Sequence, residues 1–104
     1  MVKHMVAWKL KPEARATKEI ADANYAHQIE RMESMKAAVP QLLSYEIYRS
    51  FNIGDNFFDF VIIMNFNSRE DLEIFEHSNA HMDPEARKFM KSIREAKAVV
   101  DYEI

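Results

Sequence analysis

The chain has 104 residues, a length typical of a single domain, and we expect residues 1–104 to fold as one. Hydrophobic residues make up 48% and charged residues 30%, a balance that argues against disorder. The net charge of −3 is spread over mixed signs and gives no basic stripe for a phosphate backbone, so we expect no nucleic-acid partner. No apolar run approaches the roughly 20 residues that cross a bilayer, so we expect no membrane partner.

Cysteine and glycine usage narrows the possible chemistry further. Cysteine is absent, which excludes disulfides, thiolate metal sites and cysteine nucleophiles, and a reducing cytoplasm is the expected compartment. The single glycine excludes glycine-rich phosphate loops, so nucleotide binding by that route is excluded. The first five residues, "MVKHM", lack the charged-then-apolar layout of a signal peptide.

The first two elements are a strand and a long helix. Residues 2–10 alternate between apolar and mixed positions, which predicts a strand whose apolar face carries one polar residue, His4. Thr17 is a plausible N-cap for a helix that reaches to about residue 38 and is ended by Pro40. The apolar stripe that we expect to face the core consists of Ala21, Tyr25, Ile29, Met32, Met35 and Val39.

A β-hairpin is predicted in the middle of the chain. Residues 43–51 and 57–66 have strand-like patterns, and the turn between them contains Gly54, where a positive φ is expected. The second of these strands, "FFDFVIIMNF", is apolar on both faces. A strand of this kind is covered on both sides in the folded protein.

The last third of the sequence predicts a broken helix and a final strand. Ser68 and Asp71 form a capping-box pattern that starts a helix, and the pattern weakens at residues 78–79. Asp83 and Pro84 then restart it as an N-cap and a first-turn proline. Residues 96–104 alternate again and predict a terminal strand.

The order of the elements predicts the fold class and a partner. The series β-α-β-β-α-β, with the second helix broken in two, is the ferredoxin-like α+β pattern, in which helices cover one face of a four-stranded antiparallel sheet. Here the opposite face is also apolar, and a soluble monomer rarely exposes such a surface. We therefore expect a homodimer that packs through the sheet face opposite the helices and closes a dimeric α+β barrel.

Three stretches resemble the stress-responsive α/β-barrel (Dabb) family, which belongs to the dimeric α+β barrel superfamily: "VKHMVAWKLK", "NAHMD" and "AVVDYEI". The resemblance implies a dimeric barrel with a cleft between sheet and helices. One plant branch of the family consists of polyketide cyclases, which use histidine and tyrosine side chains and no cofactor. The superfamily also includes cofactor-independent monooxygenases, haem-linked enzymes and ligand-binding regulatory domains. We expect no cofactor here.

The string "EHSNAHM" at residues 76–82 raises the possibility of a metal site. His77 and His81 are four residues apart, a spacing that puts two imidazoles on one helix face. The glutamate that such motifs place between the histidines is missing, no third ligand is evident nearby, and the helix is expected to break there. We therefore predict no metal and an exposed His77 near a helix end.

His81 and His4 are the candidate catalytic residues. By the resemblance, His81 matches the histidine that the cyclase branch uses as its acid/base, and His4 matches a strand histidine facing the same cleft. Histidine suits this role because its ordinary pKa lies near 6.5. The structural alternatives are a core histidine held by a backbone carbonyl for His4 and a helix cap for His81.

The sequence also departs from the cyclase pattern. By the resemblance, Phe75 stands where that branch has a tyrosine, and Phe60 where it has a second strand histidine, so we expect a drier pocket. Tyr25 could supply a hydroxyl, although it could also be a core aromatic residue. The expected ligand-binding residues, which could instead simply fill the core, are Trp8, Phe60, Phe75 and Phe89.

Two hypotheses follow, beside a third possibility, a purely structural oligomer, which predicts no cavity between helices and sheet. The first is a dimeric barrel that binds a small apolar or aromatic molecule without transforming it. The second is a small cofactor-independent enzyme, cyclase-like or monooxygenase-like, with His81 as acid/base and His4 in support. They differ in whether replacing His81 abolishes turnover or only changes affinity.

Overall fold

The computed structural model describes all residues of the chain, 1–104. Four strands, three α-helices and one short 3₁₀ turn alternate along it. In chain order they are β1 (Val2–Leu10), the 3₁₀ turn (Pro12–Arg15), α1 (Lys18–Ala38), β2 (Ser44–Arg49), β3 (Phe60–Phe66), α2 (Arg69–Glu76), α3 (Pro84–Ile93) and β4 (Arg94–Glu103).

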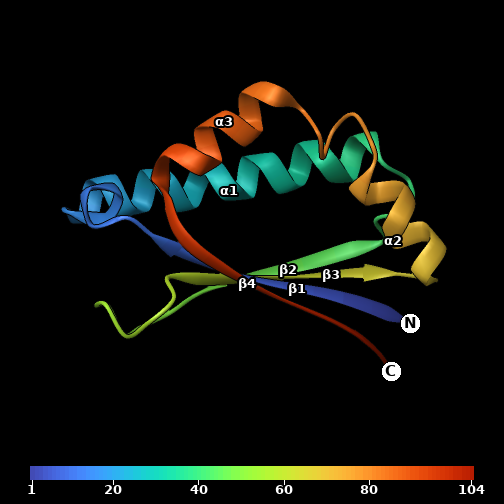
Figure 1. Ribbon diagram of the computed structural model, residues 1–104, viewed down its shortest axis with the longest axis horizontal. Helices are drawn as coiled ribbons and strands as arrows, with labels where there is room; N and C mark the ends of the chain where they lie inside the picture. The colour runs from blue at the N-terminus through green and yellow to red at the C-terminus, as the bar shows by residue number, and fades with distance from the viewer.

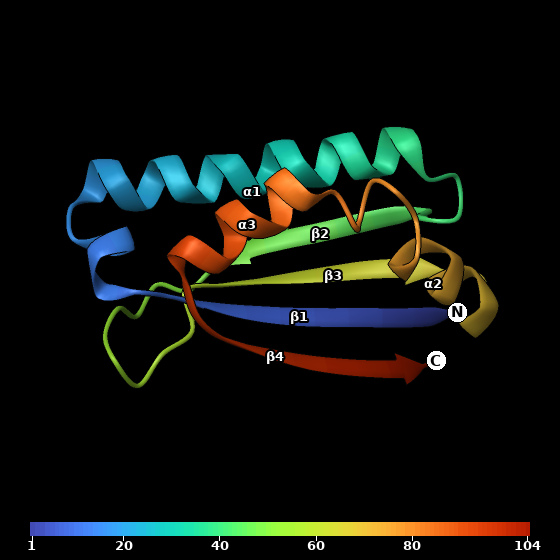
Figure 2. The ribbon, with the colours of Figure 1, turned by 45° about the horizontal axis from the view of Figure 1, so that its top comes forward.

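The strands form one antiparallel sheet in the order β2-β3-β1-β4. All three helices lie on the same side of this sheet, and its other side carries no element of the chain (Figures 1 and 2). The two chain ends meet at one end of the sheet, where the backbones of Met1 and Ile104 are hydrogen-bonded. The predicted ferredoxin-like α+β fold, with its second helix broken into α2 and α3, is confirmed. No helix combines the length and the apolar sequence needed to span a bilayer.

The predicted helix starts are confirmed by their capping bonds. The side chains of Thr17, Ser68 and Asp83 each accept a hydrogen bond from the backbone N–H three residues further on, at 3.2, 3.1 and 3.0 Å. These bonds satisfy N–H groups that have no partner within the helix itself. The break between α2 and α3 is therefore set by an independent start signal at Asp83.

The hairpin differs from the prediction at its tip. β3 begins at Phe60 instead of residue 57, and β2 ends at Arg49 instead of residue 51. Asp59 explains the shorter strand, because its carboxylate accepts the backbone N–H of Leu10 at 2.7 Å and so ends the regular ladder. The connecting loop contains Gly54 with φ of +143°, as predicted.

The inward face of α1 also differs from the prediction. Gln28, 2% exposed, lies in the core, whereas Ile29 is 37% exposed. The buried positions follow a spacing of three and four residues from Gln28 to Met32 and Met35, and Ile29 lies about 100° away around the helix. The buried amide is paired, since Gln28 Nε2 lies 2.8 Å from the sulfur of Met90 on α3.

The sheet is apolar on both faces. Its helix-facing side forms the core with residues such as Val6, Ile62 and Phe66. On the opposite side, Met5 lies between its cross-strand neighbours Ile63 and Val100, and none of the three belongs to the buried core. Val100 is 48% exposed. This second apolar face was predicted from the alternation of the strands, and nothing within the chain covers it.

Candidate functional site

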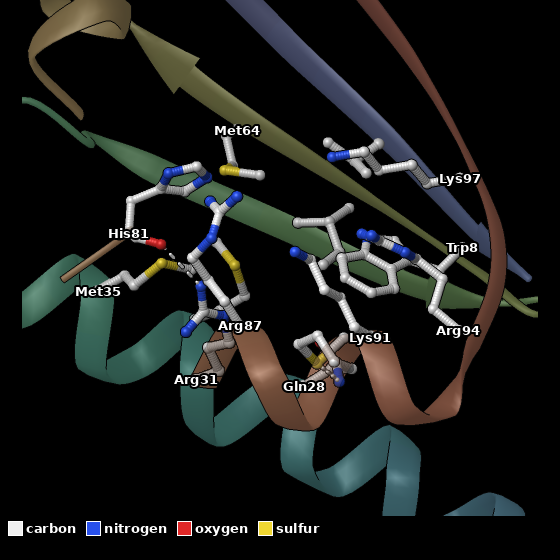
Figure 3. A pocket seen from close by; sticks show the side chains of 14 residues that line it. Trp8, Gln28, Arg31, Met35, Met64, His81, Arg87, Lys91, Arg94 and Lys97 are labelled. Carbon is white, nitrogen blue, oxygen red and sulfur yellow. Dashed lines mark hydrogen bonds between the residues drawn. The ribbon is translucent and has the colours of Figure 1, made fainter. Parts of the chain in front are cut away.

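A cleft opens between the helix-facing side of the sheet and the two helices α1 and α3 (Figure 3). Its volume is about 110 Å³. Half of its lining is apolar and comes from β1, β3, α1 and α3. These residues are Val6, Trp8, Met32, Met35, Ile62, Met64 and Met90.

The other half of the lining is polar and mainly basic. Figure 3 shows His81 at one end of the cleft and Trp8 at the other, with basic side chains reaching in from α3 and the start of β4. No aspartate or glutamate lines it. The polar residues are Gln28, Arg31, His81, Arg87, Lys91, Arg94 and Lys97.

The ring of His81 is fixed in one orientation and one tautomer. Its Nδ1 lies 2.9 Å from the backbone carbonyl oxygen of Glu76. Because a carbonyl oxygen only accepts, Nδ1 carries the proton of the neutral ring and donates it to Glu76. The ring also packs on Phe75, with centroids 5.0 Å apart. Nε2 has no hydrogen-bond partner in the protein and keeps a free lone pair.

Burial lowers the pKa of His81 below its usual 6.5. The nearby cations of Arg31 and Arg87 lower the pKa further, and the hydrogen bond to the Glu76 carbonyl opposes the effect by favouring the charged ring. His81 is consequently neutral at pH 7. A neutral imidazole with a free Nε2 can accept a proton, which is the requirement for a general base.

His4 is buried at 8% exposure, on the helix-facing side of β1 between its cross-strand neighbours Met64 and Asp101. Its Nδ1 contacts the carboxylate of Asp101, which orients the ring and makes Nδ1 the donor. His4 is not part of the cleft lining, but its charge when protonated lowers the pKa of His81, so the two rings lie within electrostatic reach.

Trp8, Phe60 and Tyr25 divide between two cavities. Trp8 lines the cleft, whereas Phe60 and Tyr25 line a second cavity of about 230 Å³. The rings of Trp8 and Phe60 are stacked with centroids 6.1 Å apart, so this pair lies between the two spaces. The hydroxyl of Tyr25 donates to the Ile47 carbonyl at 3.3 Å, away from both histidines. The structure thus places Trp8 and His81 in the lining of one cleft, at opposite ends, without Tyr25 or Phe60.

Phe75 and Phe89 line neither cavity. Phe75 is fully buried, and its ring packs against the ring of His81 in a tilted arrangement. Phe89 packs on His27 of α1, with ring centroids 4.1 Å apart. His77 is exposed, as predicted, and its Nδ1 donates to the Glu73 carbonyl at 2.9 Å. No group of three or more histidine, aspartate or glutamate side chains converges as metal ligands would.

Asp101 and the basic residues of the cleft were not predicted from the sequence. Asp101 becomes the partner of His4 through the pairing of the first and last strands, a register that local periodicity does not give. The basic residues did leave a signal. Arg87 and Lys91 are four residues apart, which places them on one side of α3, and Arg94 follows three residues later at the start of β4.

Solved structures with the same fold extend over nearly the whole chain. A dimeric ferredoxin-like protein of unknown function from Bacteroides fragilis is 23% identical, with a TM-score of 0.80 over 99% of this chain and 95% of that one. A Dabb family protein from Mesorhizobium loti is 16% identical, with a TM-score of 0.74 over 99% and 95%. The hydroxynitrile lyase of Passiflora edulis is 18% identical, with a TM-score of 0.74 over 99% and 92%. At such identities the likeness concerns the fold alone.

No curated protein sequence matches the chain significantly. The sequence profile of the Stress Responsive A/B Barrel Domain, by contrast, matches residues 2–104, which include His4, His81 and the whole sheet. The chain therefore belongs to the stress-responsive A/B barrel (Dabb) family.

Proposed function

We propose that the protein binds a small molecule with an apolar or aromatic body in the cleft between the sheet and helices α1 and α3. The observation that supports this proposal most is the cavity itself. It holds about 110 Å³ between the sheet and the helices, and half of the residues that line it are apolar. An apolar cavity of roughly 150 Å³ takes up a benzene ring, so the volume suits part of a small ligand.

The residues that line the cleft have side chains suited to contact with a ligand. Four of the seven methionines in the sequence line the cleft. Methionine side chains are unbranched and polarisable, so they adapt to the shape of a ligand more readily than branched residues. At one end the indole of Trp8 presents a flat aromatic surface, with the guanidinium of Arg94 at 4.9 Å from its centroid.

Trp8 offers a direct test, because it is the only tryptophan and it lines the cleft. Titration with small aromatic compounds is expected to change the emission of Trp8 and, over the same concentration range, to raise the melting temperature. Both are measured by fluorescence. Compounds that raise the melting temperature but never alter the emission of Trp8 would bind elsewhere and contradict the proposal.

We further propose that the protein is a homodimer whose interface is the sheet face opposite the helices. This face is a continuous apolar surface across β1, β3 and β4, and burying it yields roughly 25 cal/mol per Å² before the costs of association. The similar Bacteroides fragilis protein is described as dimeric, and its fold extends over 99% of this chain. Two such sheets packed face to face would close a barrel with the helices outside.

A charge on that face is expected to separate the protomers. Ile63→Asp puts a carboxylate in the middle of the proposed interface, where desolvation would cost several kcal/mol. Sedimentation equilibrium should give twice the chain mass of 12.3 kDa for the wild type and 12.3 kDa for the variant. Ile74→Asp on the outer side of α2, where Ile74 is 42% exposed, is the control and should stay dimeric. A monomeric wild type at micromolar concentration would refute the interface.

A second candidate function is proton transfer by a cofactor-independent enzyme, with His81 as the base and His4 in support. The specific support is the fixed tautomer of His81, whose free Nε2 belongs to a residue that lines the cleft. Asp101 orients His4 in the way that a carboxylate orients a catalytic histidine. The hydroxynitrile lyase of Passiflora edulis shares the fold, so a barrel of this shape is compatible with catalysis.

This candidate predicts exchange of an acidic C–H bond. A cleft ligand that carries hydrogen next to a carbonyl should lose it to deuterium in D₂O faster with the protein than without it, as followed by NMR. His81→Asn is expected to lower the exchange rate by about 10²–10⁴, the usual contribution of general acid–base catalysis. His77→Asn changes an exposed histidine four residues away and should leave the rate unaltered. Equal exchange rates for both variants would contradict a catalytic role of His81, and only the proposed binding function would remain.

The lowered pKa of His81 predicts a pH dependence of stability. In the unfolded chain His81 takes up a proton near its ordinary pKa of 6.5, whereas the folded protein does so only at lower pH. Stability is therefore lost as the pH falls from 6.5 towards the folded-state pKa. His81→Asn should lose less stability between pH 7.5 and 5 than the wild type does, in urea unfolding at matched concentration. The same loss in both proteins would argue against the buried, neutral His81.

A further inference from the structure

Positive charge is concentrated in the cleft. The chain has 14 lysine and arginine residues against 17 aspartate and glutamate residues, yet five of the former and none of the latter line this one cavity. In a chain of net negative charge, about a third of the lysine and arginine side chains therefore lie around the apolar part of this cleft. They come from three elements: Arg31 from α1, Arg87 and Lys91 from α3, and Arg94 and Lys97 from β4.

These five cations have no ion-pair partners. All six ion pairs of the structure involve other side chains, namely those of His4, Lys9, Arg15, Lys18, Arg49 and Arg69. Burial lowers the pKa of Arg31 and of Lys97, and Arg87 lowers the pKa of both further. Asp83 offsets this in part for Arg31, and Glu76 does so for Lys97. For Lys97 the repulsion by Arg94 and Arg87 is greater than the attraction by Glu76, whereas for Arg31 the attraction by Asp83 is greater than the repulsion by Arg87.

The arrangement on α3 shows the same imbalance locally. Arg87 and Lys91 are four residues apart on α3, so two like charges adjoin along one side of the helix, and Arg94 follows as the first residue of β4. Such neighbours destabilise a helix in the absence of an opposite charge. Lys88, also on α3, is exposed and does not line the cleft. The protein thus tolerates two adjacent cations on the side of α3 that borders the cavity.

From this charge distribution, we propose that the ligand of the cleft is an organic anion, a carboxylate or phosphate carried on an apolar ring or short chain. The inference rests on the proposed binding function and specifies the charge of its ligand. The apolar body would lie on the floor between Trp8 and Met64, and the acidic group would face the basic walls (Figure 3).

The chemistry of the basic residues suits such a head group. Three of the five are arginines, whose planar guanidinium can bind two oxygens of a carboxylate or phosphate at once. Arg31 is held by its bond to the His81 carbonyl at 3.2 Å, and Arg94 by its place over the Trp8 ring. Both side chains are therefore ordered before a ligand arrives, which lowers the entropic cost of binding.

A matched series of probes tests the charge requirement. Benzyl alcohol, phenylacetate and phenyl phosphate share one ring and carry no charge, one negative charge and up to two. The emission of Trp8 is followed during titration at 20 mM and at 500 mM NaCl. We expect both anions to bind at least about tenfold more tightly than the alcohol at low salt, and only the anions to weaken at high salt. The order of the two anions tells a carboxylate site from a phosphate site.

Variants of α3 locate the effect. Arg87→Gln and Lys91→Gln each remove one charge from the cleft, and each is expected to weaken phenylacetate by about three- to tenfold while benzyl alcohol is unaffected. Lys88→Gln removes the same charge from the same helix outside the cleft and is the control. Its affinity for phenylacetate should stay within about twofold of the wild type.

The outcomes distinguish a failure of the charge requirement from a failure of the proposed binding function. If the alcohol binds as well as the anions, or if Lys88→Gln weakens phenylacetate as much as Arg87→Gln does, the charge requirement is refuted and a cleft for apolar ligands remains. If none of the three probes, including phenyl phosphate, changes the emission of Trp8 at millimolar concentration, the proposed binding function fails with it.

Discussion

The register of β1 between β3 and β4 is the constraint on which the other features of this protein depend. β1 is a central strand, and each residue from Val2 to Trp8 has one neighbour on β3 and one on β4. On the helix-facing side, this register places Val6 beside Ile62 in the floor of the cleft and His4 beside Asp101. Because side chains alternate along a strand, a slip of β1 by one residue would turn the side chains of Val6 and His4 to the opposite face of the sheet.

The same register produces the second apolar surface. Met5 is brought between Ile63 and Val100, so three strands contribute to a single patch on the side without helices. The cleft and the proposed dimer interface are thus two faces of one strand arrangement. A change that disturbs the pairing of β1 would affect ligand binding and assembly together, even if it lies far from either surface.

The break between α2 and α3 is the second element of the site. The hydroxyl of Ser78 donates to the Phe75 carbonyl at 2.6 Å and accepts the backbone N–H of His81 at 3.2 Å, which folds the chain back. The carbonyl oxygen of Glu76, at the end of α2, then accepts a hydrogen bond from the Nδ1–H group of His81. Ending the helix early therefore supplies both the position and the tautomer of this histidine.

Local sequence patterns predicted the elements well and the site only in part. Strand alternation and the caps at Thr17, Ser68 and Asp83 depend on near neighbours, so they could be derived from the sequence. The burial of Gln28 in place of Ile29 depends on how α1 crosses the sheet and meets Met90 on α3. The His4–Asp101 contact joins residues 97 positions apart and needs the strand order. Such relations are properties of the folded chain and have no local signature.

The basic walls and the neutral histidine are linked electrostatically, and this link bears on the choice between binding and catalysis. Arg31 and Arg87 contribute to the lowered pKa of His81, and an anion seated beside them would oppose their effect. His81 would then be a base in the free protein and closer to protonation in the anion complex. Proton abstraction from a neutral ligand that becomes an anion in the reaction fits this change of charge, because the same cations would stabilise the product-like transition state. With a ligand that is already an anion, the cations would act in binding, and His81 would be a less effective base.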